Sequence, residues 1–378
     1  MFLKSSRVQS CDRAVEDLVS SSFFHRPRIV AIPACNEEEH IVPCLLALAD
    51  QGKYRPDKVV VWINNTDDST VERASAVRGE LPFLLEIVEV RYAPASAHAG
   101  RARHDAMAHA ARHAPHDALL FTTDADGEVA RDWMRCTLEA FTRYDVAAVF
   151  GRALLLPGEA GKIPPHLHED EAAEQVYGAL LDQIGSLIDP DPHDPWPRHT
   201  EHSGASIAVT YEAWARVGGI PFVASGEDRA FYTALRLAEL PVRHAPEVKV
   251  YVSARLVGRA AGGMAETIAR RILRQDEYVD DVLEAVSTRL LRIRRAAGRQ
   301  RKGVTGRPVL PALPDAPVRI PRQSLPLHHR RAQRVLDFLK QRVGETPVTA
   351  GRGSGDRCDR MQTVPYDPLS SDFHGSSD

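Results

Sequence analysis

Residues 59–70 read Val-Val-Val-Trp-Ile-Asn-Asn-Thr-Asp-Asp-Ser-Thr, an apolar run of five residues closed by amides, carboxylates and hydroxyls. Such a continuous apolar run is typical of a strand buried on both faces of a parallel sheet. Similar runs occupy 28–32, 84–90 and 119–122, and helical patterns such as 38–49 and 99–111 follow them. The alternation predicts an α/β fold with an open, mostly parallel sheet flanked by helices. Ligands of such sheets bind outside the carboxyl ends of the strands, where a site is therefore expected.

The composition excludes two broad classes of protein. With 43% hydrophobic and 26% charged residues among 378, the chain can build a core and is not disordered throughout. The formal net charge of -3 lacks the positive field of a general nucleic-acid binder, so no nucleic-acid partner is expected. Five scattered cysteines without a CxxC pair predict reduced thiols, and charged or polar residues interrupt the apolar stretches. We therefore expect a soluble, cytoplasmic protein.

Composition also divides the chain into three parts. Residues 1–27 form an N-terminal extension with little periodicity, whereas 28–298 carry the strand and helix patterns of a single main domain, with halves at 28–150 and 151–298. Residues 299–378 are rich in Arg, Pro, Gly and Ser, which predicts a linker and a largely disordered tail with one short helix over 328–343. Flexible termini are therefore expected on both sides of the domain.

Polar residues follow the first two predicted strands. After the first, Asn36 is placed to cap the next helix, with three glutamates in its first turn, where they suit the helix dipole. After the second, the amides of Asn64 and Asn65 offer donors and acceptors to a base or ribose edge. Neither GxGxxG nor a GxxxxGK motif follows a strand, which argues against a dinucleotide oxidoreductase and a P-loop NTPase.

The strand over 119–122 is followed by two aspartates that can share a ligand. Asp124 and Asp126 are two positions apart, so in an extended segment they point the same way, and Gly127 permits close backbone approach. Two adjacent like charges are unfavourable unless a cation bridges them. Mg²⁺ or Mn²⁺ binds through one or two carboxylates plus substrate phosphates. The sequence therefore predicts a divalent-cation site, with an acidic solvated turn as the alternative.

In order and spacing, the motifs over 28–263 resemble those of a family 2 glycosyltransferase with the GT-A fold. The segments that carry the resemblance are IPACNEEEHIVPCLLAL, VVVWINNTDDST, AGRARHDAMAHA, LLFTTDADGEV and GEDRAFYTALRLAEL. The resemblance implies a nucleotide-diphosphate sugar as donor, bound by residues 28–150, and an acceptor bound by 151–298. The residues matching the family's donor-binding positions are Pro33, Asn36, Glu37, Asn64, Asn65, Arg101 or Arg103, and Asp124. Many relatives have aspartate where this chain has Asn64 and Asn65, so the nucleobase is left open.

The same resemblance assigns the metal and the catalytic base. Asp126 is expected to ligate the divalent cation directly, Asp124 to contact ribose or a metal-bound water, and His202 is a further candidate ligand to metal or acceptor. The carboxylate matching the family's base is Asp228, beside Glu227, in a motif that begins at Gly226 and opens a helical pattern. An acidic first turn stabilised by the helix dipole is the alternative interpretation of that motif.

Two further segments, together with Gly226, are assigned to the diphosphate or the acceptor. His199 and His202 follow a proline-rich loop and precede Ser206, in a stretch similar to the family's acceptor-side segment. Arg255 and Arg259 lie in a glycine-containing segment that predicts a lid clamping a diphosphate, or else a mobile loop with solvated arginines.

These observations predict a metal-dependent hexosyltransferase, inverting with Asp228 as base, that acts on a small soluble acceptor. Two alternatives stay open: a retaining enzyme, because the segment from Ser253 resembles that of glucosyl-phosphoglycerate-type synthases, and a non-catalytic sugar-nucleotide binder. The run LLRIRRAAGRQRK at 290–302 is compatible with an anionic membrane surface but more simply packs on the body. The sequence leaves the oligomeric state open.

Overall fold

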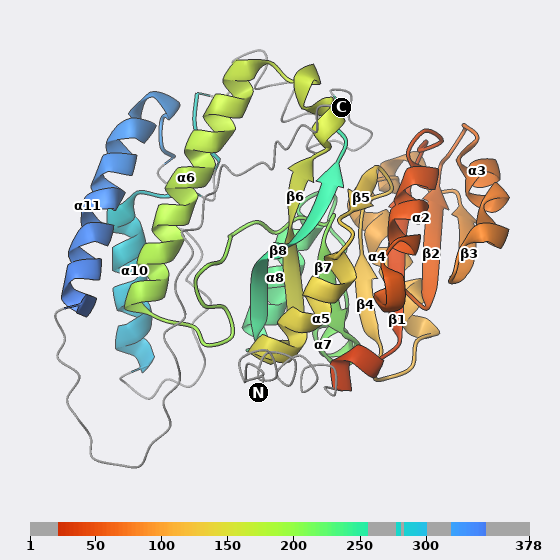
Figure 1. Ribbon diagram of the computed structural model, residues 1–378, viewed down its shortest axis with the longest axis horizontal. Coiled ribbons are helices and arrows are strands. Elements are labelled where there is room, and N and C mark those ends of the chain that lie inside the picture. Colours follow the sequence, from red (N-terminus) through yellow and green to blue (C-terminus); the bar gives the residue numbers. More distant parts are fainter. Residues whose placement is uncertain (1–21, 256–276, 281–282, 301–318, 345–378) are drawn as a thin grey trace, which may run out of the picture.

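The computed structural model describes residues 22–255, 277–280, 283–300 and 319–344 (Figure 1). Its described strands form one eight-stranded sheet in the order β3-β2-β1-β4-β7-β6-β8-β5. The pairs β3/β2, β2/β1, β1/β4 and β6/β8 are parallel, and the pairs that involve β7 or β5 are antiparallel. The strands are β1 (Arg28–Ala34), β2 (Lys58–Asn64), β3 (Leu84–Val90), β4 (Leu119–Thr122), β5 (Gly127–Val129), β6 (Ala148–Leu155), β7 (Ile207–Thr210) and β8 (Val242–Val252).

Helices cover both faces of this sheet. The covering helices are α2 (Ile41–Ala49), α3 (Thr70–Ala76) and α5 (Trp133–Tyr144) on one face, and α4 (Ala99–Arg112), α7 (Tyr211–Val217) and α8 (Glu227–Leu237) on the other. Successive β1 residues point to opposite faces, so Val30 and Ile32 join the first core whereas Ile29 and Ala31 join the second. Because both faces are buried, the strand reads as a continuous apolar run. The prediction of an α/β fold with a mostly parallel sheet is confirmed.

A third core lies beside the sheet, where α6 (Pro165–Ile188), α10 (Val286–Gln300) and α11 (Leu325–Gly344) pack together (Figure 1). The helix expected over 328–343 is thus present as α11, and it is a packed helix within the stretch predicted as linker and tail. Leu325, Ala332 and Leu336 recur at helical spacing and are at most 5% exposed, a pattern that the arginine-rich composition conceals. Residues 1–21, 301–318 and 345–378 lie outside the described residues.

The expected internal boundaries fall inside elements of structure. Residue 150 lies in β6, which pairs with both β7 and β8, so the sheet is continuous between the two expected halves. Residue 298 lies in α10. None of the described helices is both long and apolar enough to cross a membrane.

Candidate active site

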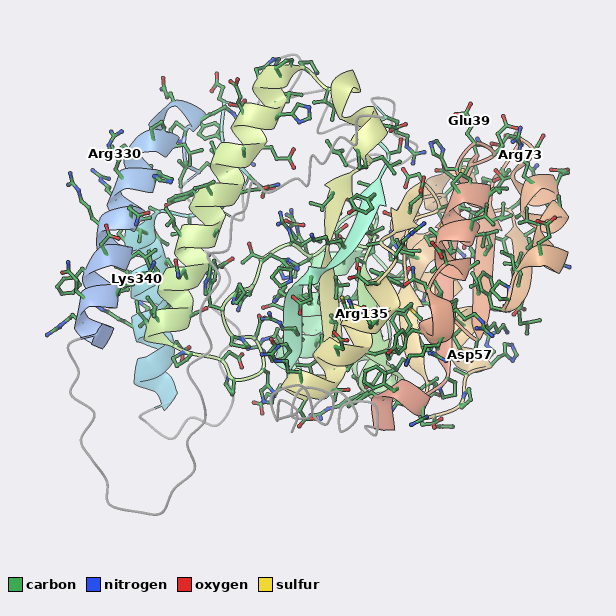
Figure 2. All side chains as sticks on the ribbon, in the orientation of Figure 1. Glu39, Asp57, Arg73, Arg135, Arg330 and Lys340 are labelled. Carbon is green, nitrogen blue, oxygen red and sulfur yellow. The ribbon has the colours of Figure 1, made fainter. Side chains whose placement is uncertain are left out.

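The loops after β1 and β2 are joined by short hydrogen bonds. Helix α2 begins at Ile41, so the expected role of Asn36 as its N-cap is wrong. Asn36 instead has a left-handed φ of 54°, and its Oδ1 accepts a hydrogen bond from the Asp67 backbone N–H at 2.9 Å. The Glu37 N–H donates to Thr70 Oγ1 at 2.8 Å. These hydrogen bonds hold Glu37 in the interior, where it is 4% exposed. In Figure 2, Glu39, two residues further on, and Asp57, just before β2, lie at opposite ends of the strands.

The two asparagines after β2 have different surroundings. The side-chain amide of Asn65 forms two hydrogen bonds with the backbone of Tyr92: Nδ2 donates to the Tyr92 carbonyl at 2.9 Å, and Oδ1 accepts from the Tyr92 N–H at 3.0 Å. Its side chain therefore ties the end of β2 to the segment after β3. Asn64 is 6% exposed at the strand end. Pro33 lies within β1 in register with Trp62.

Arg103 connects four parts of the chain from the buried face of α4. Its guanidinium donates to Glu227 at 3.0 Å, to Asp124 at 2.5 Å, to Thr122 Oγ1 at 3.1 Å and to the Gly204 carbonyl at 2.8 Å. A Cβ on Gly204 would lie 2.6 Å from the arginine Cζ, so only glycine admits the guanidinium here. Arg103 is thus a buried counterion that positions Asp124 and Glu227.

Arg101, the other candidate basic residue, is partly exposed. Its guanidinium lies 4.3 Å from the centroid of the Tyr92 ring and donates to Asp105 at 3.3 Å. The Tyr92 hydroxyl donates to the same carboxylate at 2.7 Å. This arginine therefore lies beside the residue that Asn65 holds, between the ends of β2 and β3.

Asp124 and Asp126 converge beyond β4, as their spacing predicted. Asp124 pairs with Arg103, and Asp126 Oδ2 pairs with Arg255 at 2.8 Å. Burial and the adjacent Asp124 charge raise the pKa of Asp126 to about 6, although Arg255 opposes the rise. A Cβ on Gly127 would lie 3.3 Å from the Asp124 carbonyl, which shows how tight the turn is. The pair therefore carries negative charge that its two arginines do not fully neutralise.

A divalent cation fits this pair of carboxylates. Each arginine bond involves one oxygen, so in the described part of the chain Asp124 Oδ2 and Asp126 Oδ1 have no hydrogen-bond partner. Hard oxygen ligands of this kind suit Mg²⁺ and Mn²⁺, which take their remaining ligands from water and substrate phosphates. No group of three or more His, Cys, Asp or Glu side chains able to hold a metal occurs among the described residues, so His202 does not complete this site.

Arg255 closes over the ends of β1 and β4. Besides Asp126, its guanidinium binds both oxygens of Glu37, at 2.8 and 3.0 Å. His40 lies 3.4 Å from the same Glu37 carboxylate, and this contact raises the pKa of His40. The rest of the predicted lid, Arg259 included, lies outside the described residues.

Asp228 lies on the other side of Arg103. Gly226, with φ of 74°, precedes α8, and the Glu227 side chain turns inward to Arg103. Asp228 Oδ2 accepts a hydrogen bond from the Gly204 N–H at 3.1 Å. Burial, and then the neighbouring Glu227, raise the pKa of Asp228, which strengthens it as a base. Because the Gly204 carbonyl also accepts from Arg103, one arginine and one glycine link the base candidate to the DxD pair. We call Glu37, Arg103, Asp124, Asp126, Glu227, Asp228 and Arg255 the donor-side cluster.

Ser206 does not lie where the sequence placed it, and among the described residues His202 does not join the DxD carboxylates in a metal-holding group. Ser206 is 1% exposed and its Oγ accepts from the Trp133 indole at 2.8 Å, so the expectation that it contacts diphosphate or acceptor is wrong: the hydroxyl is part of the core. His202 Nε2 lies 3.2 Å from His244 Nε2, away from any metal-holding group in the described residues. Its role as a metal ligand is therefore not proposed.

Sequence reasoning missed the residues around His202. Asp194 and His244 are both buried and lie 2.7 Å apart through Oδ2 and Nδ1. Asp194 also pairs with Arg198 at 2.7 Å and Arg243 at 3.1 Å. No local motif marks these residues; the one available signal is two arginines and a histidine at strand or loop positions that should be apolar. We call Asp194, Arg198, His199, His202, Arg243 and His244 the histidine cluster.

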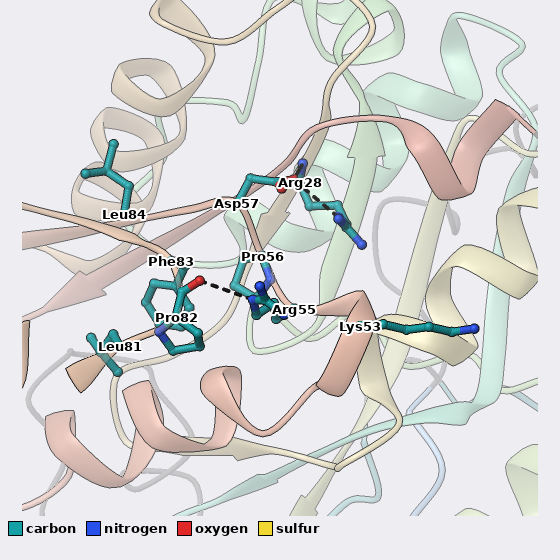
Figure 3. A pocket seen from close by; sticks show the side chains of 9 residues that line it. All are labelled: Arg28, Lys53, Arg55, Pro56, Asp57, Leu81, Pro82, Phe83 and Leu84. Carbon is teal, nitrogen blue, oxygen red and sulfur yellow. Dashed lines mark hydrogen bonds and ion pairs between the residues drawn. The ribbon is translucent and has the colours of Figure 1, made fainter. Parts of the chain in front are cut away.

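A pocket of about 540 Å³ lies at the opposite, amino-terminal edge of the sheet (Figure 3). Its charged walls are already paired: Arg28 donates to Asp57 at 2.8 and 3.3 Å, and Arg55 donates to the Pro82 carbonyl at 3.1 Å. Asp57 precedes β2, so the pocket is not at the strand ends that carry the donor-side cluster. The candidate active site is therefore the cluster and not this pocket.

Residues 29–195, which include the first two strand ends and both DxD carboxylates, match the model of the family described as glycosyl transferase family 2. These residues form a family 2 glycosyltransferase domain. The resemblance inferred from the motifs is thereby confirmed for this segment. No curated protein has a sequence that matches this chain.

Three solved structures are similar to this glycosyltransferase at a distance. S. aureus TarS is 16% identical with a TM-score of 0.43, over 74% of this chain and 44% of TarS. Mannosyltransferase PcManGT from Pyrobaculum calidifontis, in complex with GDP-Man and Mn²⁺, is 17% identical with a TM-score of 0.43, over 90% and 83%. Glucosyl-3-phosphoglycerate synthase from Mycobacterium tuberculosis, in complex with Mn²⁺, UDP and phosphoglyceric acid, is 15% identical with a TM-score of 0.42, over 69% and 81%. At these identities and TM-scores, the likeness assigns neither donor nor acceptor to this chain.

Proposed function

We propose that this glycosyltransferase moves a hexose from a nucleotide-diphosphate sugar to a hydroxyl group of a small acceptor, with inversion at the transferred carbon. The observation that carries the proposal is the donor-side cluster: two convergent, incompletely neutralised carboxylates at the strand ends, linked through Arg103 and Gly204 to a third carboxylate of raised pKa.

The reaction forms one covalent bond and breaks another. The acceptor oxygen bonds to C1 of the sugar while the bond from C1 to the diphosphate oxygen breaks, and the nucleoside diphosphate leaves. Asp228 takes the proton of the acceptor hydroxyl, because its carboxylate is fixed by Gly204 and has a raised pKa. A bound Mn²⁺ or Mg²⁺, held by Asp124 and Asp126, supplies positive charge to the leaving diphosphate.

The remaining residues of the cluster fix positions and charge. Arg103 holds Asp124 and Glu227 in place from a buried site, so it is a positioning residue. Arg255 is the cation beside Asp126 that is exposed enough to reach a diphosphate, with 26% of its side chain exposed. Asn64 and the segment after β1 lie at the strand ends where such sheets bind a nucleoside.

A ligand screen tests this proposal. UDP-, GDP- and ADP-glucose are added with and without Mn²⁺ in thermal unfolding, followed by an assay for released nucleoside diphosphate. We expect at least one donor to raise the melting temperature only when Mn²⁺ is present, because a ligand that binds the folded state stabilises it by mass action. We also expect slow release of its nucleoside diphosphate. Binding without any release or transfer would instead indicate a sugar-nucleotide-binding protein, and no binding of any donor would contradict the proposal.

A further inference from the structure

A chain of three side chains leads from the protein interior to the neighbourhood of Asp228. Asp194 Oδ2 lies 2.7 Å from His244 Nδ1, and His244 Nε2 lies 3.2 Å from His202 Nε2. Asp194 and His244 are 4% and 1% exposed, whereas His202 is partly exposed. The series therefore has a buried end, at the aspartate, and an accessible end, at His202.

The buried end fixes the first proton. Asp194 accepts hydrogen bonds from Arg243 at 3.1 Å and from the His244 backbone N–H at 2.9 Å, and it forms an ion pair with Arg198 at 2.7 Å. Although burial opposes it, the His244 ring, Arg198 and the His244 backbone N–H lower the pKa of Asp194 below the ordinary value, so the carboxylate is ionised. An ionised carboxylate only accepts, so the proton between Asp194 and His244 is on Nδ1 of the histidine.

The protonation of His244 then determines which nitrogen of His202 carries a proton. Two arginines already face the Asp194 charge, so a third buried cation at His244 is unfavourable and the ring is neutral. Burial likewise lowers the pKa values of His244 and His202, the latter to about 2. With Nδ1 protonated, His244 Nε2 carries a lone pair and accepts the proton of His202 Nε2. His202 is left with an unprotonated Nδ1.

The His202 ring lies close to the turn of α8 that carries the proposed catalytic base. The His202 ring packs on Tyr232 with centroids 4.0 Å apart, and Tyr232 follows Asp228 by four residues on α8. Residues at this spacing are neighbours on a helix surface, about 5–6 Å apart at Cβ. His202 is also two residues before Gly204, whose N–H binds Asp228. In the described part of the chain, His202 Nδ1 has no hydrogen-bond partner, and it is not among the buried unpaired atoms.

We infer that His202 is a specificity-determining residue that accepts a hydrogen bond at Nδ1 from a second hydroxyl of the acceptor, while Asp228 binds the reacting hydroxyl. The acceptor class that fits is a polyol or saccharide with neighbouring hydroxyl groups, because the His202 ring packs on Tyr232, one helical turn along α8 from Asp228. Asp194 and His244 are positioning residues, since they fix which nitrogen of His202 is free. This inference rests on the proposed function for the identity of the reacting hydroxyl.

The protonation of the two rings is tested without any ligand. In the ¹⁵N-labelled protein, long-range proton–nitrogen correlation spectra report which nitrogen of each histidine carries a proton, and the signals of His202 are assigned by their loss in His202→Asn. We expect a proton on Nε2 of His202 and on Nδ1 of His244. A proton on Nδ1 of His202, or a doubly protonated ring at neutral pH, would overturn the inference.

The role of the free nitrogen is tested with two acceptor probes that share a carbon skeleton. Glycerol has neighbouring hydroxyls and 1-propanol has one hydroxyl, so the ratio of transfer to the two isolates the second contact. With Mn²⁺ and the donor that the screen selects, we expect the parent enzyme to prefer glycerol by roughly tenfold, the value of one hydrogen bond. His202→Phe should lose this preference with an unchanged KM for the donor, and His202→Asn should retain it, because its amide oxygen takes the place of Nδ1.

The remaining outcomes of the acceptor assay would contradict the role of His202. Equal transfer to both probes by the parent, transfer to neither, or equal loss of the preference in the Phe and Asn variants would overturn the inference. The near-unchanged donor KM separates a lost acceptor contact from misfolding. If no sugar nucleotide binds at all, the proposed function fails, and the assignment of protons on His202 and His244 is still decided by the spectra.

Discussion

The donor-side cluster and the histidine cluster are both buried groups of charges, but their charge balance is opposite. The donor-side cluster sets five carboxylates against two arginines, Arg103 and Arg255. The histidine cluster sets one carboxylate, Asp194, against two arginines, and its histidine rings stay neutral.

The difference separates a group that needs a ligand from one that does not. Buried charge without compensation is unfavourable, so an acidic cluster at strand ends gains stability when a cation arrives. In the histidine cluster, hydrogen bonds hold Asp194 and both ring nitrogens of His244, so the cluster holds structure and sets the protonation of His202. The two clusters meet near Gly204, where the donor and acceptor sides of the site join.

The largest expected effect is on catalysis. Asp228→Asn keeps the size of the side chain but removes the base, so we expect the rate of transfer to fall by roughly 10²- to 10⁴-fold. Binding of the donor and Mn²⁺, followed by thermal unfolding, should be retained. Glu212→Gln, at an exposed first-turn acid of α7, is the matched control and should be unaffected. Comparable rates for Asp228→Asn and the parent would remove this residue from the mechanism.

The next largest effect is on the free energy of unfolding, when a substitution removes the carboxylate of the histidine cluster. Asp194→Asn leaves Arg198 and Arg243 without a carboxylate, and removing one partner of a buried pair costs about 3–5 kcal/mol in the free energy of unfolding. Asp67→Asn removes a pair in which both side chains are 75% exposed and should change stability by less than about 1 kcal/mol. Urea unfolding of both variants measures the contrast. Equal effects would show that the cluster does not carry structure.

The third effect has opposite signs with and without metal. Because the pKa of Asp126 is raised, its charge destabilises the folded state at pH 7.5, so Asp126→Asn should stabilise the metal-free protein by about 1 kcal/mol. Saturating Mn²⁺, at about 100 times its Kd, should stabilise the parent by about 2.7 kcal/mol and the variant far less. Calorimetry and unfolding with Mn²⁺ measure both. Equal stabilisation of the parent and the variant would exclude Asp126 as the ligand.

The smallest effect is on pH dependence. His199 Nε2 faces the Phe150 carbonyl at 3.2 Å and its Nδ1 accepts from the Glu201 N–H at 3.1 Å, so protonation breaks a bond. Burial lowers the pKa of His199 well below its value in the unfolded chain. The unfolded state therefore binds more protons, and this stability is complete above about pH 6.5 and lost below it, at up to about 1.4 kcal/mol per pH unit.

Unfolding at pH 7.5, 6.0 and 5.0 measures that slope. His199→Gln should reduce it without abolishing it, because His202 and His244 keep pKa values lowered by burial, whereas the same change at the exposed His25 should leave it unchanged. His40, whose pKa is raised by Glu37, contributes in the opposite direction and is unchanged in both variants. A slope that is the same in the parent and His199→Gln would show that the ring is protonated without cost.

Much of the donor side followed from local patterns. The apolar runs predicted the strands, and because parallel strands end at one edge, the polar residues after them were predicted to meet. The convergence of Asp124 and Asp126 followed from their spacing of two. The predicted cap role of Asn36 and the predicted contact of Ser206 with diphosphate or acceptor were wrong, because contacts with Asp67 and Trp133 decide the positions of these side chains.

The sequence by itself determined the order of strands and helices and the carboxylates at their ends, since these depend on periodicity and spacing within a few residues. Only the tertiary structure decided that Arg103 and not Arg101 is the buried counterion, that Arg255 reaches Glu37 across 218 positions, and that His244 orients His202 across 42. The physical reason is that the charge state and partner of a buried polar group depend on everything packed around it, and those neighbours come from distant parts of the chain.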